Sequence, residues 1–251
     1  MLRAEQPKHA TWEPIAPGVL RRRLPGLELN VAVVTGRDGI LLVDTGSHDH
    51  EAADLLASLA RELPSHGLPD RVVAVVNTHG HFDHCYGNAE VLRAFPDAEI
   101  WGHADLPDYL ARYADAGRAS GISHGFDPEL MNAARIVPPT RRVVREQPVT
   151  VDLGGREVVL YAPGRGHTDH DVVVHVPDCG VLIAGDMVEE SGPPVFGSDA
   201  FAAEWSDSLA RVRALDASVW LPGHGAVVDE EFVIRQHHWL AEVAAGRVVP
   251  D

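Results

Sequence analysis

The segment "NTHGHFDHCYGN" at residues 77–88 places His79, His81, Asp83 and His84 within six consecutive positions. A core rarely needs so many polar side chains together, whereas imidazole and carboxylate groups are ligands of zinc, iron and manganese ions. The segment follows a valine-rich run that is typical of a buried strand, and α/β folds expose polar groups to a cleft where strands end. This stretch therefore predicts a metal site beyond the end of a strand.

One loop cannot surround an ion alone, so further ligands must come from distant segments. Three candidates lie at or just past the ends of predicted strands: His167 in "GRGHTDHD", Asp186 in "IAGDMV" and His224 in "LPGHG". Considered alone, each of the three would be interpreted as a structural residue. Their shared position at strand ends indicates that the fold brings all three to the histidine cluster.

Short apolar runs bounded by Gly, Pro and Asp alternate along the chain with segments of helical spacing. The predicted strands span residues 18–24, 29–36, 39–46, 71–79, 98–103, 142–145, 149–153, 156–161, 171–177, 180–186 and 218–225. The predicted helices span residues 49–64, 84–95, 205–215 and 229–246, with a helical insertion at about 104–140. Two β-rich halves that each carry helices predict an α/β (α+β) fold, a four-layer αββα sandwich, as a single domain over residues 1–251.

The formal net charge of the chain is −16 at pH 7. This charge argues against binding through a general basic field, so we expect a small-molecule substrate and neither a nucleic-acid nor a membrane partner. No apolar signal region and no long uncharged apolar stretch is visible, so a cytoplasmic location is expected. Cys85 and Cys179 are predicted to be lone thiols. The oligomeric state is left open.

With these residues in this order, the chain resembles the metallo-beta-lactamase superfamily across residues 18–240. The match is to that family's H-x-H-x-D-H motif, here at residues 79–84, followed by the later histidine, aspartate and histidine in the expected sequence. "DTG" at residues 44–46 is similar to the family's early aspartate-bearing turn. The pattern is highly specific for fold and metal and poorly specific for substrate, because this fold hosts many reactions.

The resemblance implies two divalent metal ions, expected to be zinc, with iron and manganese as alternatives. The ligands would divide between the ions as His79, His81 and His167 for the first and Asp83, His84 and His224 for the second. Asp186 would bridge the two ions. Asp44 would orient a ligand or brace the histidine loop.

The resemblance also implies a hydrolase in which a hydroxide shared by both metals cleaves an ester-like bond of a lactone, thioester, ester or amide. Asp83 and Asp186, with that water, would be the catalytic groups. Asp186 favours the glyoxalase II-like and lactonase-like branches, since class B β-lactamases usually have cysteine or serine there. Residues 225–251 are too few for the C-terminal helical domain of glyoxalase II, so a true glyoxalase II is not expected. Substrate contacts are expected in three segments, at 25–29, 103–147 and 188–201.

Three alternatives remain open at this point. A mono-iron persulfide dioxygenase of the same superfamily would use the equivalents of His79, His167 and Asp186. A β-lactamase or phosphodiesterase of the same fold is the second alternative, and the net charge argues against long nucleic acids as its substrate. A non-catalytic metal-binding protein is the third, although such a protein needs no open site between two ions.

Overall fold

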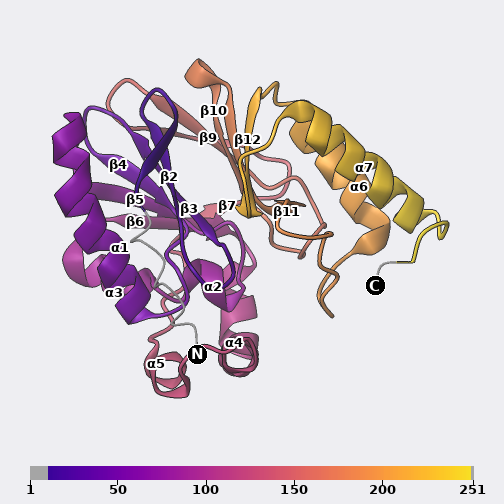
Figure 1. Ribbon diagram of the computed structural model, residues 1–251, viewed down its shortest axis with the longest axis horizontal. Helices are drawn as coiled ribbons and strands as arrows, with labels where there is room; N and C mark the ends of the chain where they lie inside the picture. Colours follow the sequence, from indigo (N-terminus) through magenta and orange to yellow (C-terminus); the bar gives the residue numbers. More distant parts are fainter. Residues whose placement is uncertain (1–10, 250–251) are drawn as a thin grey trace, which may run out of the picture.

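Two β-sheets lie face to face in the computed structural model, which describes residues 11–249, and helices cover both outer sides (Figure 1). The first sheet has the strand order β1-β2-β3-β4-β5-β6-β7, and the second has the order β12-β11-β10-β9-β8. Helices α1 (Asp49–Glu62) and α3 (Asn88–Ala94) pack on the first sheet. Helices α6 (Ala202–Arg213) and α7 (Glu230–Ala244) pack on the second. These are the four layers of the predicted αββα sandwich.

The first sheet is antiparallel at one side and parallel at the other. Its strands are β1 (Glu13–Ala16), β2 (Val19–Arg23), β3 (Asn30–Thr35), β4 (Ile40–Val43), β5 (Val72–Val76), β6 (Glu99–His103) and β7 (Arg141–Val143). Neighbours run antiparallel from β1 to β4 and parallel from β4 to β7. Strands β3 and β4 are buried along their whole length, because both faces of the sheet are covered. This explains their almost unbroken aliphatic runs.

The second sheet repeats this plan with fewer strands. Its strands are β8 (Val149–Asp152), β9 (Glu157–Tyr161), β10 (Val173–Val176), β11 (Val181–Glu189) and β12 (Val219–His224). The pairs from β8 to β11 are antiparallel, and β11 and β12 are parallel. Two short 3₁₀ helices complete the fold. The first, η1 (Leu63–His66), follows α1, and the second, η2 (Pro177–Cys179), joins β10 to β11.

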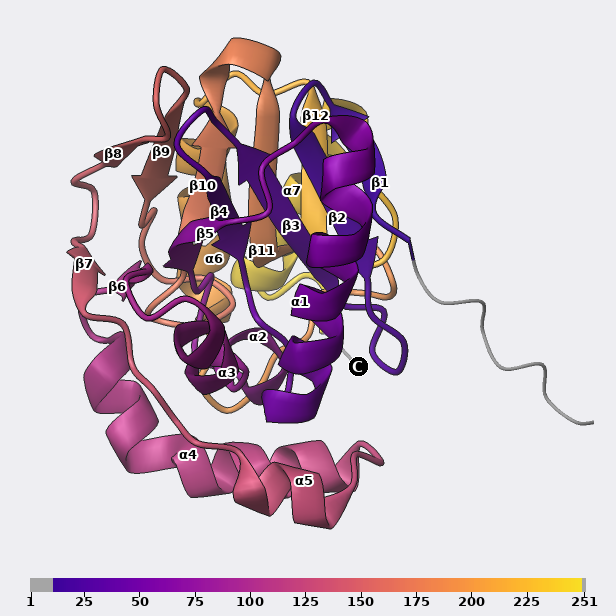
Figure 2. The same cartoon turned by 90° about the vertical axis from the view of Figure 1, so that its left-hand side faces the viewer.

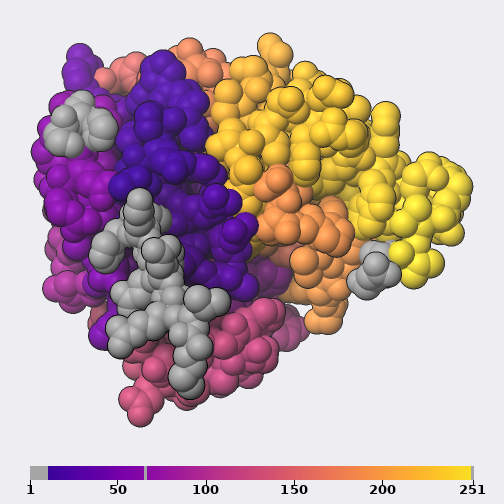
Figure 3. All heavy atoms as spheres, in the orientation of Figure 1, coloured from indigo at the N-terminus to yellow at the C-terminus, as the bar shows by residue number. Residues whose placement is uncertain are grey.

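Aliphatic side chains fill the space between the two sheets. Val34 and Val43 from the first sheet meet Leu160 and Ile183 from the second in one buried cluster. Burial of such side chains is the main favourable term in folding, at about 25 cal/mol per Å² of apolar area. The space-filling view shows the two halves of the chain packed side by side (Figure 3). This core fixes the sheets against each other and so fixes where their strands end.

The predicted helical insertion contains α4 (Leu106–Ser123) and α5 (Pro128–Ala133), which lie beyond one end of the sandwich (Figure 2). Leu106, Leu110 and Met131 pack there against aromatic side chains of the histidine segment. The insertion is therefore anchored directly on the segment that predicts the metal site. No helix within residues 11–249 is long and apolar enough to cross a membrane.

The helix predicted over residues 84–95 is instead two helices, α2 (Phe82–Cys85) and α3. The break falls at Gly87, whose backbone touches the strand-to-helix loop. A Cβ on Gly87 would collide with the carbonyl oxygen of Thr45, and the Gly87 N–H donates to the carbonyl of Gly46 at 3.1 Å. A contact between residues so far apart in sequence overrides the local helical spacing.

The first sheet differs from prediction at two places. The strand predicted over residues 39–46 ends at Val43, because Asp44 has φ 62° and turns the chain out of the sheet. Strand β1 was not predicted, since its sequence "EPIA" contains proline and lacks alternation. It is an edge strand with an irregular register against β2 near Pro14.

Candidate metal centre

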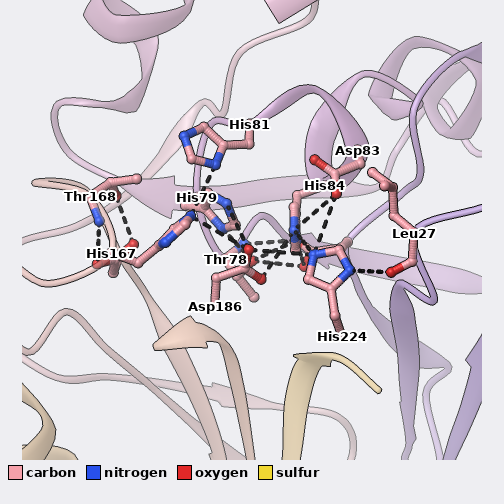
Figure 4. A network of polar contacts seen from close by, with 12 residues as sticks. Leu27, Thr78, His79, His81, Asp83, His84, His167, Thr168, Asp186 and His224 are labelled. Carbon is pink, nitrogen blue, oxygen red and sulfur yellow. Dashed lines mark hydrogen bonds and ion pairs between the residues drawn. The ribbon is translucent and has the colours of Figure 1, made fainter. Parts of the chain in front are cut away.

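The structure brings all seven candidate ligands to one end of the sandwich (Figure 4). They come from both sheets, which explains their wide separation in sequence. His79 and His81 follow β5, Asp83 and His84 lie in α2, His167 lies between β9 and β10, Asp186 lies in β11, and His224 ends β12. All seven therefore lie close together in space, although Asp186 lies within its strand and not at the end of it.

His79, His81, His167 and Asp186 form the first group. His81 Nδ1 lies 3.0 Å from His167 Nε2, and Asp186 Oδ2 lies 3.5 Å from His167 Nε2 and 3.8 Å from His79 Nε2. Three ring nitrogens and one carboxylate oxygen therefore face a common point. This is the donor set that zinc, iron and manganese take in proteins.

Asp83, His84 and His224 form the second group. The Nε2 atoms of His84 and His224 are 3.3 Å apart, and Asp83 Oδ2 lies 3.6 Å and 3.4 Å from them, respectively. Asp186 also reaches this group, with Oδ1 3.2 Å from His84 Nε2 and Oδ2 3.4 Å from His224 Nε2. The Asp186 carboxylate therefore lies between the two groups.

Partners on the far side of three rings decide which nitrogen faces inward. His84 Nδ1 lies 2.8 Å from Asp44 Oδ2, and His224 Nδ1 donates to the carbonyl of Leu27 at 2.8 Å. An oxygen that only accepts holds the ring proton on that nitrogen, so Nε2 keeps its lone pair for the centre. His81 has the opposite arrangement, with Nε2 3.1 Å from a carboxylate of Asp199 and Nδ1 turned inward.

Asp44 also braces the histidine loop. Its Oδ1 accepts from the backbone N–H of Thr78 at 2.8 Å, and its Oδ2 accepts from the Thr78 hydroxyl at 2.7 Å. Asp44 is itself buried. One carboxylate therefore fixes both the start of the loop and the ring of His84.

The unpartnered atoms of this centre fit a metal. His79 Nε2 and Asp186 Oδ1 are buried and form no hydrogen bond within the described part of the chain, although Asp186 Oδ1 has the ion-pair contact with His84 given above. Buried polar atoms are almost always satisfied, so such atoms in one cluster call for an ion. The ring nitrogens of His81 and His167 face each other as donors to a shared ion would.

A family model for the metallo-beta-lactamase superfamily matches residues 25–224, a range that spans most of both sheets. The chain belongs to this superfamily. Proteins of the family bind divalent metals, often zinc, and the two side-chain groups described above are where this member could bind them.

Three curated relatives are 24% to 30% identical to this chain over the aligned residues. "Metallo-beta-lactamase type 2" of Bacillus cereus is 24% identical over 210 residues, 82% of this chain and 70% of that protein. "Hydroxyacylglutathione hydrolase" of Gloeobacter violaceus is 30% identical over 174 residues, 68% of this chain and 54% of that protein. An "Acyl-coenzyme A thioesterase" of Gallus gallus is 28% identical over 174 residues, which are 65% of this chain and 58% of that protein. All three names are those of hydrolases.

A solved structure has the same fold. The metallo-beta-lactamase FIM-1 from Pseudomonas aeruginosa, in its mono-zinc form, superimposes with a TM-score of 0.70 at 23% identity. The match covers 94% of this chain and 96% of that one. The predicted sandwich is confirmed by this likeness, which concerns the fold alone.

The surroundings of Asp186 differ from prediction. It does not close its strand, because β11 continues to Glu189. Instead the register against β12 shifts between Ile183 and Gly185 and again beyond Gly185, which has φ 52°. A Cβ on Gly223 of β12 would overlap Asp186 Oδ1. A bulge and a missing side chain on the neighbouring strand therefore give the carboxylate its place.

The histidines of this superfamily member differ in the direction in which the protein shifts their pKa. Burial, helped by the neighbouring imidazoles, holds the pKa of His79 well below its usual range, and burial lowers that of His167 to about 4. Burial also opposes the charged form of His224, but Asp186 and Asp83 outweigh it and raise its pKa to about 10. The acidic side chains thus already attract positive charge, which a metal would supply in place of protons.

Two side chains near the centre were missed in the sequence. Asp199 Oδ2 lies 3.1 Å from His81 Nε2 and accepts a hydrogen bond from the hydroxyl of Tyr109 at 3.0 Å. Tyr109 lies on α4, and Asp199 lies on the loop before α6. Neither has a ligand motif around it, because tertiary packing alone brings them to the histidine loop.

A pocket of about 760 Å³ opens onto the two ligand groups. All three segments expected to contact substrate contribute to its wall: Leu27 from the β2–β3 hairpin, the inner face of α4, and residues between 189 and 201. His124 is on this wall, whereas His103 is not among its lining residues. The pocket is large enough for a small molecule whose reacting bond reaches the metal groups.

Proposed function

We propose that this metallo-hydrolase uses two divalent ions, expected to be zinc, to cleave an ester-like bond of a small molecule. The bond would be that of a lactone, thioester, ester or amide. The observation that carries the proposal is the place of Asp186, whose two oxygens approach the ring nitrogens of both ligand groups. Relatives named as a thioesterase and as a hydroxyacylglutathione hydrolase support this reaction class.

The proposed ligand division follows the two groups. The first ion would be held by His79, His81 and His167, the second by Asp83, His84 and His224, and both by Asp186. Bound divalent ions supply Lewis acidity and a water of lowered pKa. Asp83, which lines the pocket, would accept the proton that a nucleophilic water gives up and would return it to the leaving group.

The positions of the neighbouring groups support these roles. Asp44 and the carbonyl of Leu27 fix the rings of His84 and His224, so the second group needs little rearrangement to bind an ion. The side chains of Asp83 and Asp186 are buried, which strengthens their electrostatic action on the reacting atoms. We propose no separate serine or cysteine nucleophile.

A substrate panel in a pH-stat tests the proposal, because proton release reports hydrolysis without a chromophore. Metal-replete protein would be offered lactones, thioesters, simple esters, β-lactams and phosphodiesters. We expect metal-dependent turnover of an ester-like class and loss of at least about 10³-fold in kcat for Asp186→Ala. The matched control is Asp97→Ala, at an exposed turn before β6, which should keep full activity.

Metal analysis separates the alternatives. Two zinc ions per chain in the wild type, and fewer in Asp186→Ala, would agree with a bridged site. One iron per chain with oxygen uptake and no hydrolysis would contradict the proposal and favour the dioxygenase. Full activity of Asp186→Ala would contradict the bridging role.

A further inference from the structure

The outer wall of the pocket is one face of α4. Tyr109, Tyr113, Gly117, Ser120 and His124 recur at helical spacing and all line the cavity. The rings of Tyr109 and Tyr113 lie 5.1 Å apart. Tyr113 is 50% exposed, which makes it one of the few large apolar side chains open to solvent in the described chain. This face therefore offers an aromatic surface beside the reacting groups.

The aromatic wall is held in place before any ligand arrives. The Tyr109 ring lies 4.2 Å from that of His170, and its hydroxyl donates to Asp199. On its other side it packs on the histidine loop at Gly80, where an added Cβ would lie only 2.6 Å from the Tyr109 ring. A fixed aromatic surface binds an apolar group at a low cost in conformational entropy.

The segment between residues 189 and 201 adds two apolar side chains to the pocket, Val195 and Phe201, and Val195 is 58% exposed. Its other lining residues are acidic side chains, serines and a glycine. Leu27 completes the mouth from the hairpin between β2 and β3. A substrate group bound between these residues and α4 would be removed from contact with water on several sides. An aromatic or aliphatic group therefore gains the most free energy from binding there.

The pocket wall away from the metal groups has acidic side chains and no basic ones. Apart from the seven candidate ligands and His124, the titratable groups that line it in residues 11–249 are Asp169, Glu189, Asp199 and two tyrosines, and none of the lining residues is arginine or lysine. A carboxylate or phosphate on the non-reacting part of a substrate would find no side-chain cation there. It would lose hydration and face like charges, which costs affinity.

The nearby arginine at the rim does not fill this role. The guanidinium of Arg165 lies over the ring of Phe201, 4.7 Å from its centroid, and forms an ion pair with Glu204 at 3.4 Å. Its side chain is 47% exposed and is not among the residues that line the pocket. The pocket is thus cation-poor where a substrate tail would lie.

We propose that this pocket selects uncharged substrates, in which the group next to the scissile bond is aromatic or aliphatic and lies on Tyr109 and Tyr113. Substrates with a carboxylate or phosphate in that group are rejected. The proposal deepens the proposed function and depends on it for the reaction, whereas charge selection is a property of the walls.

A pair of esters with one leaving group tests the selection. 4-Nitrophenyl valerate and 4-nitrophenyl hemiglutarate have acyl chains of equal length, ending in a methyl group and in a carboxylate. With zinc-loaded protein we expect kcat/KM to be at least about tenfold higher for the valerate ester. Equal values, or a preference for the hemiglutarate ester, would overturn the proposal.

A charge placed on the wall tests the cause. Tyr113→Arg adds a cation to the exposed wall, and Tyr113→Leu removes the ring without adding charge. We expect Tyr113→Arg to narrow the valerate preference by about fivefold or more, and Tyr113→Leu to lower both rates while keeping the preference. A preference that narrows equally in both variants would contradict charge selection.

Binding separates this proposal from the hydrolase proposal. Calorimetry on zinc-loaded protein would compare benzohydroxamic acid with its 4-carboxy derivative, two probes that differ only by the carboxylate. We expect the uncharged probe to bind about tenfold more tightly even if neither ester is cleaved, in which case only the hydrolase proposal fails. Equal binding, or tighter binding of the carboxylate, would overturn charge selection whether or not the esters are cleaved.

Discussion

At the scale of the residue, Asp44 acts on the centre without belonging to either ligand group. Its backbone has a positive φ of 62°, which is uncommon for a residue other than glycine. That conformation turns the carboxylate from the end of β4 toward Thr78 and His84, where it takes three contacts of 2.7 to 2.8 Å. Local strain here is offset by the hydrogen bonds that hold the loop.

Asp44→Asn should therefore weaken the second ligand group while leaving the fold intact. Asparagine removes the negative charge and cannot accept with both side-chain atoms, so the ring of His84 loses its orienting partner. We expect metal affinity to fall by about 10- to 100-fold, measured by competition with a chromophoric chelator. Asp38→Asn, in an exposed turn of the same sheet, is the control. Unchanged affinity in Asp44→Asn would refute the role given to Asp44.

The seven candidate ligands could be selected from the sequence because each is a metal-binding side chain near the end of an apolar run, and that they bind metal stays a prediction. Asp199 and Tyr109 could not be predicted, because their role depends on a loop and an inserted helix meeting over His81. The prediction that a strand ends at Asp186 is wrong, because β11 continues to Glu189. Local spacing indicates which residues can bind, whereas long-range packing decides what orients them.

At the scale of the element, β11 and β12 form the platform of the centre. They are parallel neighbours whose register shifts twice, on either side of Gly185, and Asp186 lies within the second shift. The space for its carboxylate is provided by the missing side chain of Gly223. The strand pattern was predictable from the valine and leucine runs, but the bulge was not, because it depends on the partner strand.

Gly223→Ala should displace Asp186 and disable the centre. The new Cβ would overlap Asp186 Oδ1, so either the carboxylate or the strand must move. We expect a stability loss of about 1–3 kcal/mol in urea unfolding and loss of most bound metal by elemental analysis. Gly192→Ala, where an added Cβ meets nothing within 4 Å, is the matched control and should change neither quantity. Normal metal content in Gly223→Ala would show that the site tolerates the shift.

At the scale of the whole molecule, the centre joins the two halves of the sandwich. His79, His81, Asp83 and His84 come from the first half, and His167, Asp186 and His224 come from the second. The layers themselves follow from the sequence, since two sets of apolar strands with amphipathic helices have few ways to bury both faces. The single-domain organisation stays a prediction, supported by the aliphatic core that both sheets share.

Removing metal should lower the stability of the entire fold. An ion that binds only the native state adds RT ln(1 + [L]/Kd), about 2.7 kcal/mol when free metal is 100-fold above Kd. Treatment with EDTA should thus lower Tm in calorimetry, and zinc should restore it. In Asp186→Ala the EDTA effect should be much smaller. An equal shift in that variant would mean that the stabilising ion binds elsewhere.

The division of ligands between distant strands also has a consequence during synthesis. His224 ends β12, so a nascent chain cannot assemble the second group until nearly all of both sheets has left the ribosome. Completion of the two-ion centre would then be a late, post-translational event that reports a finished sandwich. Zinc uptake by stalled chains of increasing length would reach two ions per chain only after residue 224 is exposed.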